Sequence, residues 1–148
     1  MNIVKATTKH LDILTPLFDG YMMFYQQQSN LEKHRAYLEE RLRLNEAKAF
    51  IAVADNGEGI GFTLLYPTFS SVSQARIYTL NDLFIHSDHR RKGVASALLS
   101  AAARYAKTNG AVRLHLETEA SNSSAQNFYE NEGWIRESNY FYYYNLQD

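Results

Sequence analysis

Residues 82–96 read DLFIHSDHRRKGVAS, and this stretch joins the end of a predicted strand, 75–85, to the beginning of a predicted helix, 93–108. The first turn of a helix has amide groups without partners inside the helix and carries partial positive charge, which suits a phosphate or pyrophosphate. Gly93 and Ala95 keep bulk away from such an anion. Charge at its rim would come from the three preceding basic residues, Arg90, Arg91 and Lys92. The stretch favours a pyrophosphate site, although a solvated basic turn before a helix explains the same residues.

The remaining apolar pattern alternates between strand and helix periods. Strands are expected at residues 3–6, 49–54, 60–66, 75–85, 112–117, 134–137 and 141–146. Helices are expected at residues 11–25, 31–44, 93–108 and 123–132. The crossover from 75–85 through the helix to 112–117 is right-handed and makes those two strands parallel. We therefore expect an α/β fold in which a mixed, twisted sheet of about seven strands has helices on both faces, in the order β-α-α-β-β-β-α-β-α-β-β.

Length and composition limit the classes of function. The 148 residues show no linker or repeat and predict a single domain over residues 1–148. The absence of cysteine excludes disulfides, thiolate metal sites and a cysteine nucleophile. A net charge of −1 argues against nucleic acid as the main partner. The first twenty residues resemble neither a signal peptide nor a membrane span, so we expect a cytoplasmic protein that does not bind membranes.

Two spaced motifs resemble those of the GNAT superfamily of N-acetyltransferases. Residues 82–85 with Arg90-Arg91-Lys92-Gly93-Val94-Ala95 resemble its acyl-CoA signature, Arg/Gln-x-x-Gly-x-Gly/Ala. The pattern Asn122-x-x-Ala125-x-x-x-Tyr129-x-x-x-Gly133-Trp134 resembles its second motif. The expected element order matches the family fold over nearly the whole chain. The resemblance implies the GNAT fold and a transferase that uses acetyl-CoA as co-substrate.

The resemblance also implies roles for individual residues at the cofactor. The backbone of residues 83–85 would pair with the pantetheine arm as an added strand does, and amides from 91 to 96 would hold the pyrophosphate. Tyr129 would protonate the leaving thiolate, a role that suits a phenol with a pKa near 10; a packing role beside Phe128 is the alternative. The implied cofactor-binding residues are Leu83, Phe84, Ile85, Arg90, Arg91, Lys92, Gly93, Val94, Ala95, Ser96, Asn122 and Tyr129.

The attacking amine must lose a proton, and a carboxylate is the natural acceptor. The candidates are Asp82 and Glu117, with Glu119 and His115 behind them. Alternation places Asp82 on the strand face of Leu80 and Phe84.

The chain also resembles the polyamine acetyltransferases, through Leu80-x-Asp82-Leu83-Phe84-Ile85 and the pair Tyr21 and Tyr25. Asn81 stands where those enzymes usually have a glutamate, and an amide cannot act as a base. A cationic substrate would bind at Tyr21, Tyr25, Asn81 and Asp82, through ring faces and a carboxylate.

The hypothesis is direct acetyl transfer from acetyl-CoA to a primary amine of a small molecule, such as a polyamine or an amino acid. Protein N-termini or lysines are alternative acceptors, and a CoA-binding regulatory module without transfer activity is the rival class. We expect no metal site, because His86 and His89 lie in a polar loop without a third ligand at a telling spacing. The aromatic run 140–144 favours a homodimer.

Overall fold

The structure, a computed structural model, describes residues 1–147, and its contacts divide the chain into two compact units. The first unit, Met1–Glu117, holds the sheet and three α-helices; the second begins at Thr118 and holds one. The strands are β1 (Asn2–Lys5), β2 (Lys48–Val53), β3 (Gly59–Ser70), β4 (Ala75–Ile85) and β5 (Arg113–His115). The α-helices are α1 (Leu11–Phe24), α2 (Leu31–Arg43), α3 (Val94–Thr108) and α4 (Ser123–Asn131), and the short 3-10 helices are η1 (Thr8–His10) and η2 (Ser87–His89). None of the described helices combines the length and hydropathy needed to cross a membrane.

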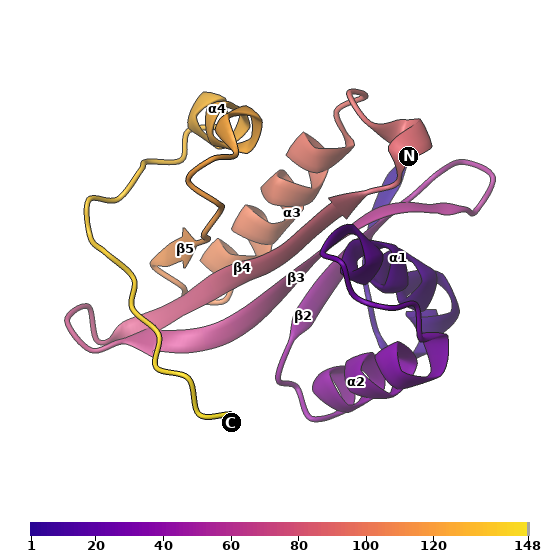
Figure 1. Cartoon of the computed structure of the whole chain (residues 1–148), viewed down its shortest axis with the longest axis horizontal. Helices are drawn as coiled ribbons and strands as arrows, with labels where there is room; N and C mark the ends of the chain where they lie inside the picture. Colours follow the sequence, from indigo (N-terminus) through magenta and orange to yellow (C-terminus); the bar gives the residue numbers. More distant parts are fainter. Residues whose placement is uncertain (148) are drawn as a thin grey trace. The chain divides into compact units, whose positions relative to one another are not determined.

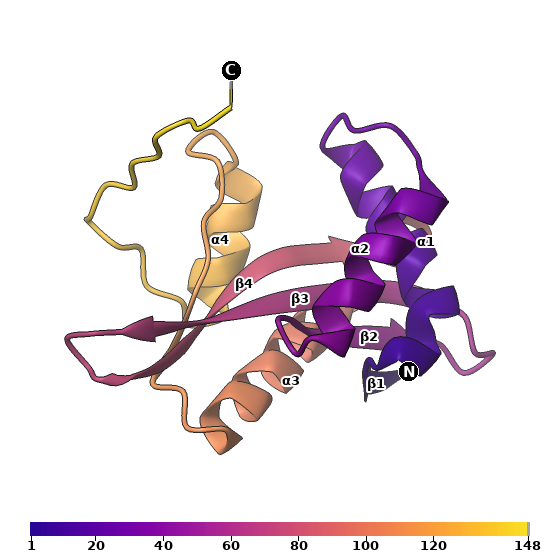
Figure 2. The ribbon, with the colours of Figure 1, turned by 90° about the horizontal axis from the view of Figure 1, so that it is seen from below.

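The sheet has the order β1-β2-β3-β4-β5. Its first four strands are antiparallel neighbours, whereas β4 and β5 are parallel and are joined by the crossover connection through α3. Helices α1 and α2 cover one face of the sheet and α3 covers the other (Figures 1 and 2). The predicted α/β class, a mixed sheet with helices on both faces, is confirmed.

The core between the sheet and the α1–α2 layer is closely packed. Phe62 and Leu64 of β3 are fully buried beside Leu14 of α1 and Leu38 of α2. A Cβ atom added to Gly20 would lie 3.1 Å from the ring of Phe84, a contact tighter than side chains normally make. Glycine at this position therefore lets α1 approach β4.

A β-bulge interrupts β4 at Asn81. Asp82 lies opposite Leu64 but Leu80 lies opposite Leu65, so Asn81 has no partner of its own on β3. Since Leu64 and Leu65 face opposite sides of the sheet, Asp82 and Leu80 do as well. The expectation that they share a face was therefore wrong. Its other half is confirmed, because Phe84 lies opposite Phe62 and shares the α1–α2 face with Asp82.

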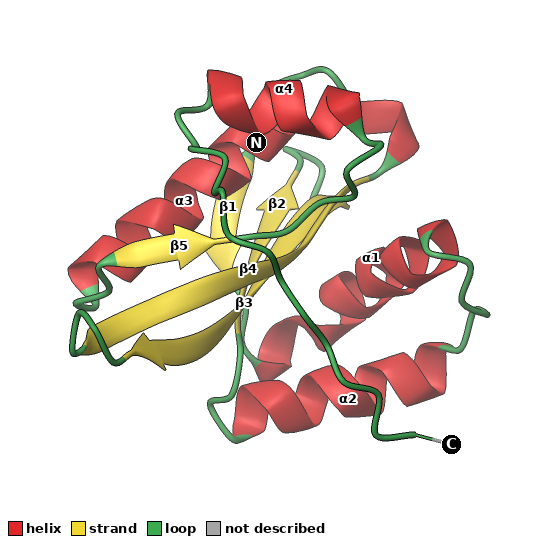
Figure 3. Cartoon of the chain, turned by 60° about the vertical axis from the view of Figure 1, so that its left-hand side comes forward, coloured by secondary structure: helices red, strands yellow, loops and turns green. Residues whose placement is uncertain are grey.

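The sheet has five strands rather than about seven. Residues 134–137 and 141–146 were predicted as strands from their aromatic and alternating pattern, but they form no strand, and Figure 3 shows the chain after α4 as loop. Such a pattern gives a strand only where another strand supplies hydrogen bonds, and no described strand pairs with either segment. β5 is likewise shorter than the predicted 112–117, because its ladder with β4 covers three residue pairs.

Candidate active site

One edge of β4 is open over its second half. β5 pairs only with Ile77, Tyr78 and Thr79, and within residues 1–147 no strand continues along that edge. The backbone of Leu83, Phe84 and Ile85 is thus paired with β3 on one side alone. An open strand edge of this kind accepts an extended ligand arm through main-chain hydrogen bonds.

The loop after β4 leads directly into the first turn of α3. Gly93 precedes this turn with a φ of 81°, a left-handed conformation that favours glycine, and a Cβ atom there would meet nothing within 4 Å. Glycine is therefore required by the backbone turn rather than by crowding within the protein. The Nε of Arg90 donates to the Ile85 carbonyl at 3.0 Å, and the Nζ of Lys92 donates to the Asp88 carbonyl at 3.2 Å. These bonds hold the predicted phosphate loop against the end of β4.

Within that first turn, Val94 is buried and anchors the helix, whereas Ala95 and Ser96 are half-buried. Arg91 and Lys92 are exposed. The structure thus brings residues 90–96 together at one helix end, next to residues 83–85. Small residues, outward-facing cations and first-turn amides suit a pyrophosphate.

Asp82 is the buried carboxylate of this region, with 3% of its surface exposed. The amide of Asn81 donates to its Oδ1 at 3.0 Å, and Thr63 Oγ1 donates to its backbone carbonyl at 2.8 Å. Burial raises the pKa of Asp82 above its ordinary value, although hydrogen bonds from Tyr21 and Asn81 act in the opposite direction. A carboxyl group with a raised pKa is better suited to accept a proton near neutral pH than an exposed one.

A line of aromatic rings on α1 connects this carboxylate with the phosphate loop. The hydroxyl of Tyr21 lies 3.5 Å from the Asn81 carbonyl, and its ring lies 4.9 Å from that of Tyr25. The Tyr25 ring is 5.3 Å from Phe24, over which the Arg90 guanidinium lies at 6.0 Å. The structure therefore brings together the predicted acceptor residues Tyr21, Tyr25, Asn81 and Asp82. The aromatic Phe24 was missed, and its exposed position at a helix end gave no periodic signal.

The other proposed proton acceptors lie in a different environment. Glu117 is exposed and follows the end of β5, so it lies outside the strand that was predicted to include it. His115 is in β5, where its Nε2 lies 2.6 Å from Thr79 Oγ1. Glu119 is exposed in the second unit. Of the four candidates, only Asp82 is buried.

The second unit contains the two remaining predicted residues. Asn122 caps α4, its Oδ1 accepting from the Ala125 amide at 3.1 Å. The Tyr129 ring lies 5.5 Å from Phe128 and 5.9 Å from Trp134. The ring of Tyr129 therefore has the packing contacts expected if its role is structural. Tyr129 is half-buried.

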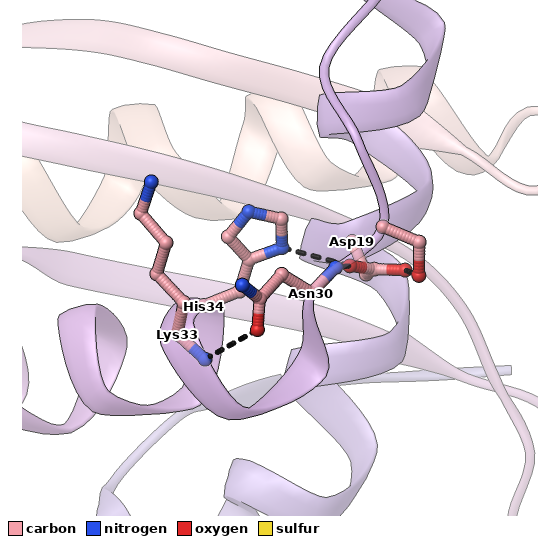
Figure 4. A network of polar contacts seen from close by, with 5 residues as sticks. Asp19, Asn30, Lys33 and His34 are labelled. Atoms are coloured by element: carbon pink, nitrogen blue, oxygen red, sulfur yellow. Dashed lines mark hydrogen bonds and ion pairs between the residues drawn. The ribbon is translucent and has the colours of Figure 1, made fainter.

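A buried polar network fixes the connection between α1 and α2 (Figure 4). The carboxylate of Asp19 accepts from Ser29 Oγ at 2.7 Å and from the Asn30 amide at 2.9 Å, and it lies 2.8 Å from His34 Nδ1. Burial alone would raise the pKa of Asp19, but hydrogen bonds from Ser29, Asn30 and His34 outweigh it and hold the pKa below its ordinary value. Sequence reasoning missed this residue, because a single acid within a helical pattern is normally exposed.

Known proteins are similar to this chain in sequence and in fold. Residues 14–134 match the family described as Acetyltransferase (GNAT) family. The uncharacterized N-acetyltransferase YhfO of Bacillus subtilis (strain 168) is 48% identical over 143 residues, which cover 97% of this chain and 95% of that protein. The crystal structure of a probable acetyltransferase is 42% identical with a TM-score of 0.90, covering 100% of this chain and 98% of that one. An aminoglycoside N-acetyltransferase, AAC(6')-Iy, solved in complex with CoA, has the same fold at 23% identity, with a TM-score of 0.82 over 99% of this chain and 95% of its own.

The family match covers most of the chain and includes both the β4–α3 loop and the predicted acceptor residues of α1 and β4. GNAT acetyltransferases use acetyl-CoA, and the predicted acyl-CoA signature lies at the open edge of β4 and the first turn of α3. The chain therefore belongs to the GNAT family of acetyltransferases and is an acetyl-CoA-dependent N-acetyltransferase.

Proposed function

We propose that the enzyme transfers the acetyl group to a primary amine of a small molecule, such as a polyamine, an amino acid or a similar compound. The observation that supports this proposal best is the buried carboxylate of Asp82, with its raised pKa, beside Tyr21 and the open edge of β4. An ammonium group is attracted to such an anion and to the faces of the aromatic rings near it. The proposed acceptor residues are therefore Tyr21, Tyr25, Asn81 and Asp82.

The residues around the β4–α3 loop fit acetyl-CoA. In this proposal the backbone of Leu83, Phe84 and Ile85 binds the pantetheine arm, and residues 90–96 bind the pyrophosphate through first-turn amides and basic side chains. Asn122 binds the pantetheine directly or through water, with its amide nitrogen, because its oxygen caps α4. Acetyl-CoA supplies the activated acetyl group as a thioester.

A single domain over residues 1–148 is part of the same proposal.

The proposed transfer is direct and needs no covalent enzyme intermediate. The neutral amine forms the new carbon–nitrogen bond with the acetyl carbon, and the carbon–sulfur bond breaks. Asp82 accepts the proton that the amine loses, directly or through water, and Tyr129 donates a proton to the departing thiolate. Glu117 is the second candidate for the proton acceptor; it is exposed and follows the end of β5.

Release of free thiol from acetyl-CoA across a panel of amines tests the proposal. The panel should contain polyamines, amino acids, and peptides with a free N-terminus or a single lysine. Thiol release with a small amine, lost in Asp82→Asn, supports the proposal. Release with the peptides alone would instead favour protein acetylation, and tight acetyl-CoA binding without release for any amine would favour a regulatory module.

We further propose that the enzyme is a cytoplasmic homodimer. The aromatic side chains of residues 140–144 support the dimer, since all are between 75% and 88% exposed in the single chain. Analytical ultracentrifugation of the full chain tests it. The cytoplasm is where the co-substrate, acetyl-CoA, is available to an enzyme of this kind.

A further inference from the structure

Three cations lie together on the α3 face of the sheet, at the end where α3 finishes. Lys5 lies opposite Phe50, whose ring is 5.6 Å from Tyr105 of α3. Lys48 is two residues before Phe50 on β2 and so faces the same side. Arg76 of β4 lies over Tyr78, whose ring is 5.9 Å from that of Tyr105.

The contacts between cations and rings show how close these residues are. The Nζ of Lys5 lies 5.3 Å from the centre of the Tyr105 ring. The guanidinium of Arg76 lies 5.9 Å from the centre of the Tyr78 ring and 4.8 Å from that of Phe69. Tyr78 and Tyr105 are themselves in contact, so Lys5 and Arg76 lie on the same group of rings. Burial lowers the pKa of Lys48, and the positive charges of Lys5 and Arg76 lower it further.

These charges have no anionic partner in the part of the chain that the structure describes. None of the ion pairs within residues 1–147 involves Lys5, Lys48 or Arg76. The ammonium of Lys48 donates only to the amide oxygen of Asn45. The protein has as many as 16 acidic residues, so this lack of pairing does not follow from composition. Three cations held together without a counterion repel one another, and a bound anion would reverse that cost.

The cluster is separate from the acetyl-CoA site. Tyr105 lies eleven residues after Val94, which corresponds to about 16 Å along α3. The pyrophosphate is proposed to bind at the first turn of α3, whereas the cation cluster lies beside its last turn. A pyrophosphate bound at the first turn of α3 therefore does not contact this cluster.

We propose that Lys5, Lys48 and Arg76 form a second anion site, which binds a phosphate group. A phosphate carries a charge of about −1.5 to −2 at neutral pH and so neutralises more of the cluster than a single carboxylate. The guanidinium of Arg76 provides paired donors for two of its oxygens, and the lysines provide mobile point charges for the others. The phosphate comes either from the free inorganic ion or from a phosphorylated small molecule.

Calorimetric titration of the enzyme saturated with CoA tests the second site, because CoA occupies the first one. Inorganic phosphate and a sugar monophosphate are titrated separately into the wild type, Lys48→Met, Arg76→Gln and Lys33→Met. Lys33 is an exposed lysine of α2 and provides the matched loss of one positive charge. We expect binding of at least one of the two probes, weakened roughly ten- to hundredfold in Lys48→Met and Arg76→Gln and unchanged in Lys33→Met. The stronger probe identifies the source of the phosphate.

Thermal unfolding separates a binding role from a packing role. In chloride, Lys48→Met should unfold at the same temperature as the wild type or above it, because a repelling charge is removed. With CoA saturating the first site, and in phosphate at equal ionic strength, the wild type should gain stability and Lys48→Met should not. The proposal is overturned if neither probe binds the CoA-saturated wild type, or if Lys48→Met and Arg76→Gln keep the wild-type affinity.

Discussion

Asp82 is a carboxylate in the core of the sheet, and its burial has opposite effects on chemistry and on stability. The raised pKa favours proton transfer near neutral pH, but the ionised group costs stability because it is removed from water. Asp82→Asn should lower turnover by roughly 10²–10⁴-fold and raise the free energy of unfolding at neutral pH. Steady-state kinetics and urea unfolding measure the two effects.

The effect on stability depends on pH with a definite sign. A pKa that is raised in the folded state destabilises the protein as pH rises through that pKa and has no effect below the ordinary aspartate pKa. The increase in the free energy of unfolding expected for Asp82→Asn should therefore disappear in acid. Glu117→Gln tests the second candidate and should leave turnover and stability near their wild-type values if Asp82 is the acceptor. Wild-type turnover in Asp82→Asn would remove this carboxylate from the reaction.

Tyr129→Phe removes only a hydroxyl group and retains the ring contacts with Phe128 and Trp134. If Tyr129 is the general acid, turnover should fall by roughly 10²–10⁴-fold while the Kd for acetyl-CoA changes little. Stopped-flow measurement of thiol release checks this under conditions where chemistry limits the rate. Tyr140→Phe, at an exposed position, serves as the control. Near-normal turnover would assign Tyr129 to packing alone.

Two substitutions of Gly93 separate the effect of backbone strain from the effect of filling the proposed anion site. Gly93→Ala puts a side chain into a left-handed conformation, which should cost about 1–2 kcal/mol of stability. Gly93→Glu adds a negative charge where the pyrophosphate is proposed to bind, so acetyl-CoA binding should be abolished in a folded protein. Gly57, with a φ of 89° and open space around it, is the matched control: Gly57→Glu has equal strain and should bind acetyl-CoA normally. Calorimetry on the three variants decides whether Gly93 lies at the anion site.

Among the elements, α1 and α2 depend on one buried carboxylate. Asp19 accepts hydrogen bonds from the loop and from α2, and charged hydrogen bonds of this kind contribute roughly 1.5–3 kcal/mol each. Asp19→Asn should lower the free energy of unfolding at neutral pH by an amount in that range. Asp12→Asn is the control, because Asp12 also pairs with a residue of α2, Arg35, but at an exposed site that should contribute below about 1 kcal/mol.

The difference between the wild type and Asp19→Asn should depend on pH in the opposite sense to that of Asp82. Because the folded-state pKa of Asp19 is lowered, its stabilising effect is present above the ordinary aspartate pKa and is lost as pH falls through the folded value. Urea unfolding at a series of pH values measures this. A difference that stays constant into strong acid would show that packing, rather than charge, carries the effect.

Local sequence rules predicted the elements whose support lies within a short stretch of chain. The strand 75–85 has the bounds of β4, and the helix 93–108 matches α3 within one residue, because apolar periodicity and the glycine turn are both local. The face of Asp82 relative to Leu80 was not predictable, since one extra residue at Asn81 changes the alternation without any signal in residue type. The two C-terminal strands were overpredicted because aromatic alternation says nothing about which strand is available as a partner.

In the candidate site as well, features set by a short stretch of sequence were predictable and features set by distant residues were not. The anion loop was predictable from the small residues and cations next to a strand, whereas Asp82 and Glu117 appeared equivalent until burial distinguished them. The network at Asp19 joins residues up to 15 positions apart and follows no motif.

For the whole molecule, the prediction of a single domain is directly testable. Contacts divide the chain near Glu117, and the only tryptophan, Trp134, belongs to the second unit, whereas the sheet belongs to the first. If the chain is one cooperative domain, urea unfolding followed by Trp134 fluorescence and by far-ultraviolet circular dichroism should give the same midpoint. An earlier fluorescence transition would indicate that the second unit unfolds by itself.

The open edge of β4 also affects how the protein behaves in a test tube or a crowded cell. An unpaired row of amide and carbonyl groups is a template for any extended chain, including a strand from another copy of the protein. Acetyl-CoA that occupies this edge would then act as a solubilising agent as well as a reactant. Preparations stripped of the nucleotide would tend to aggregate, and adding it during purification and storage would be the simplest way to keep the enzyme in solution.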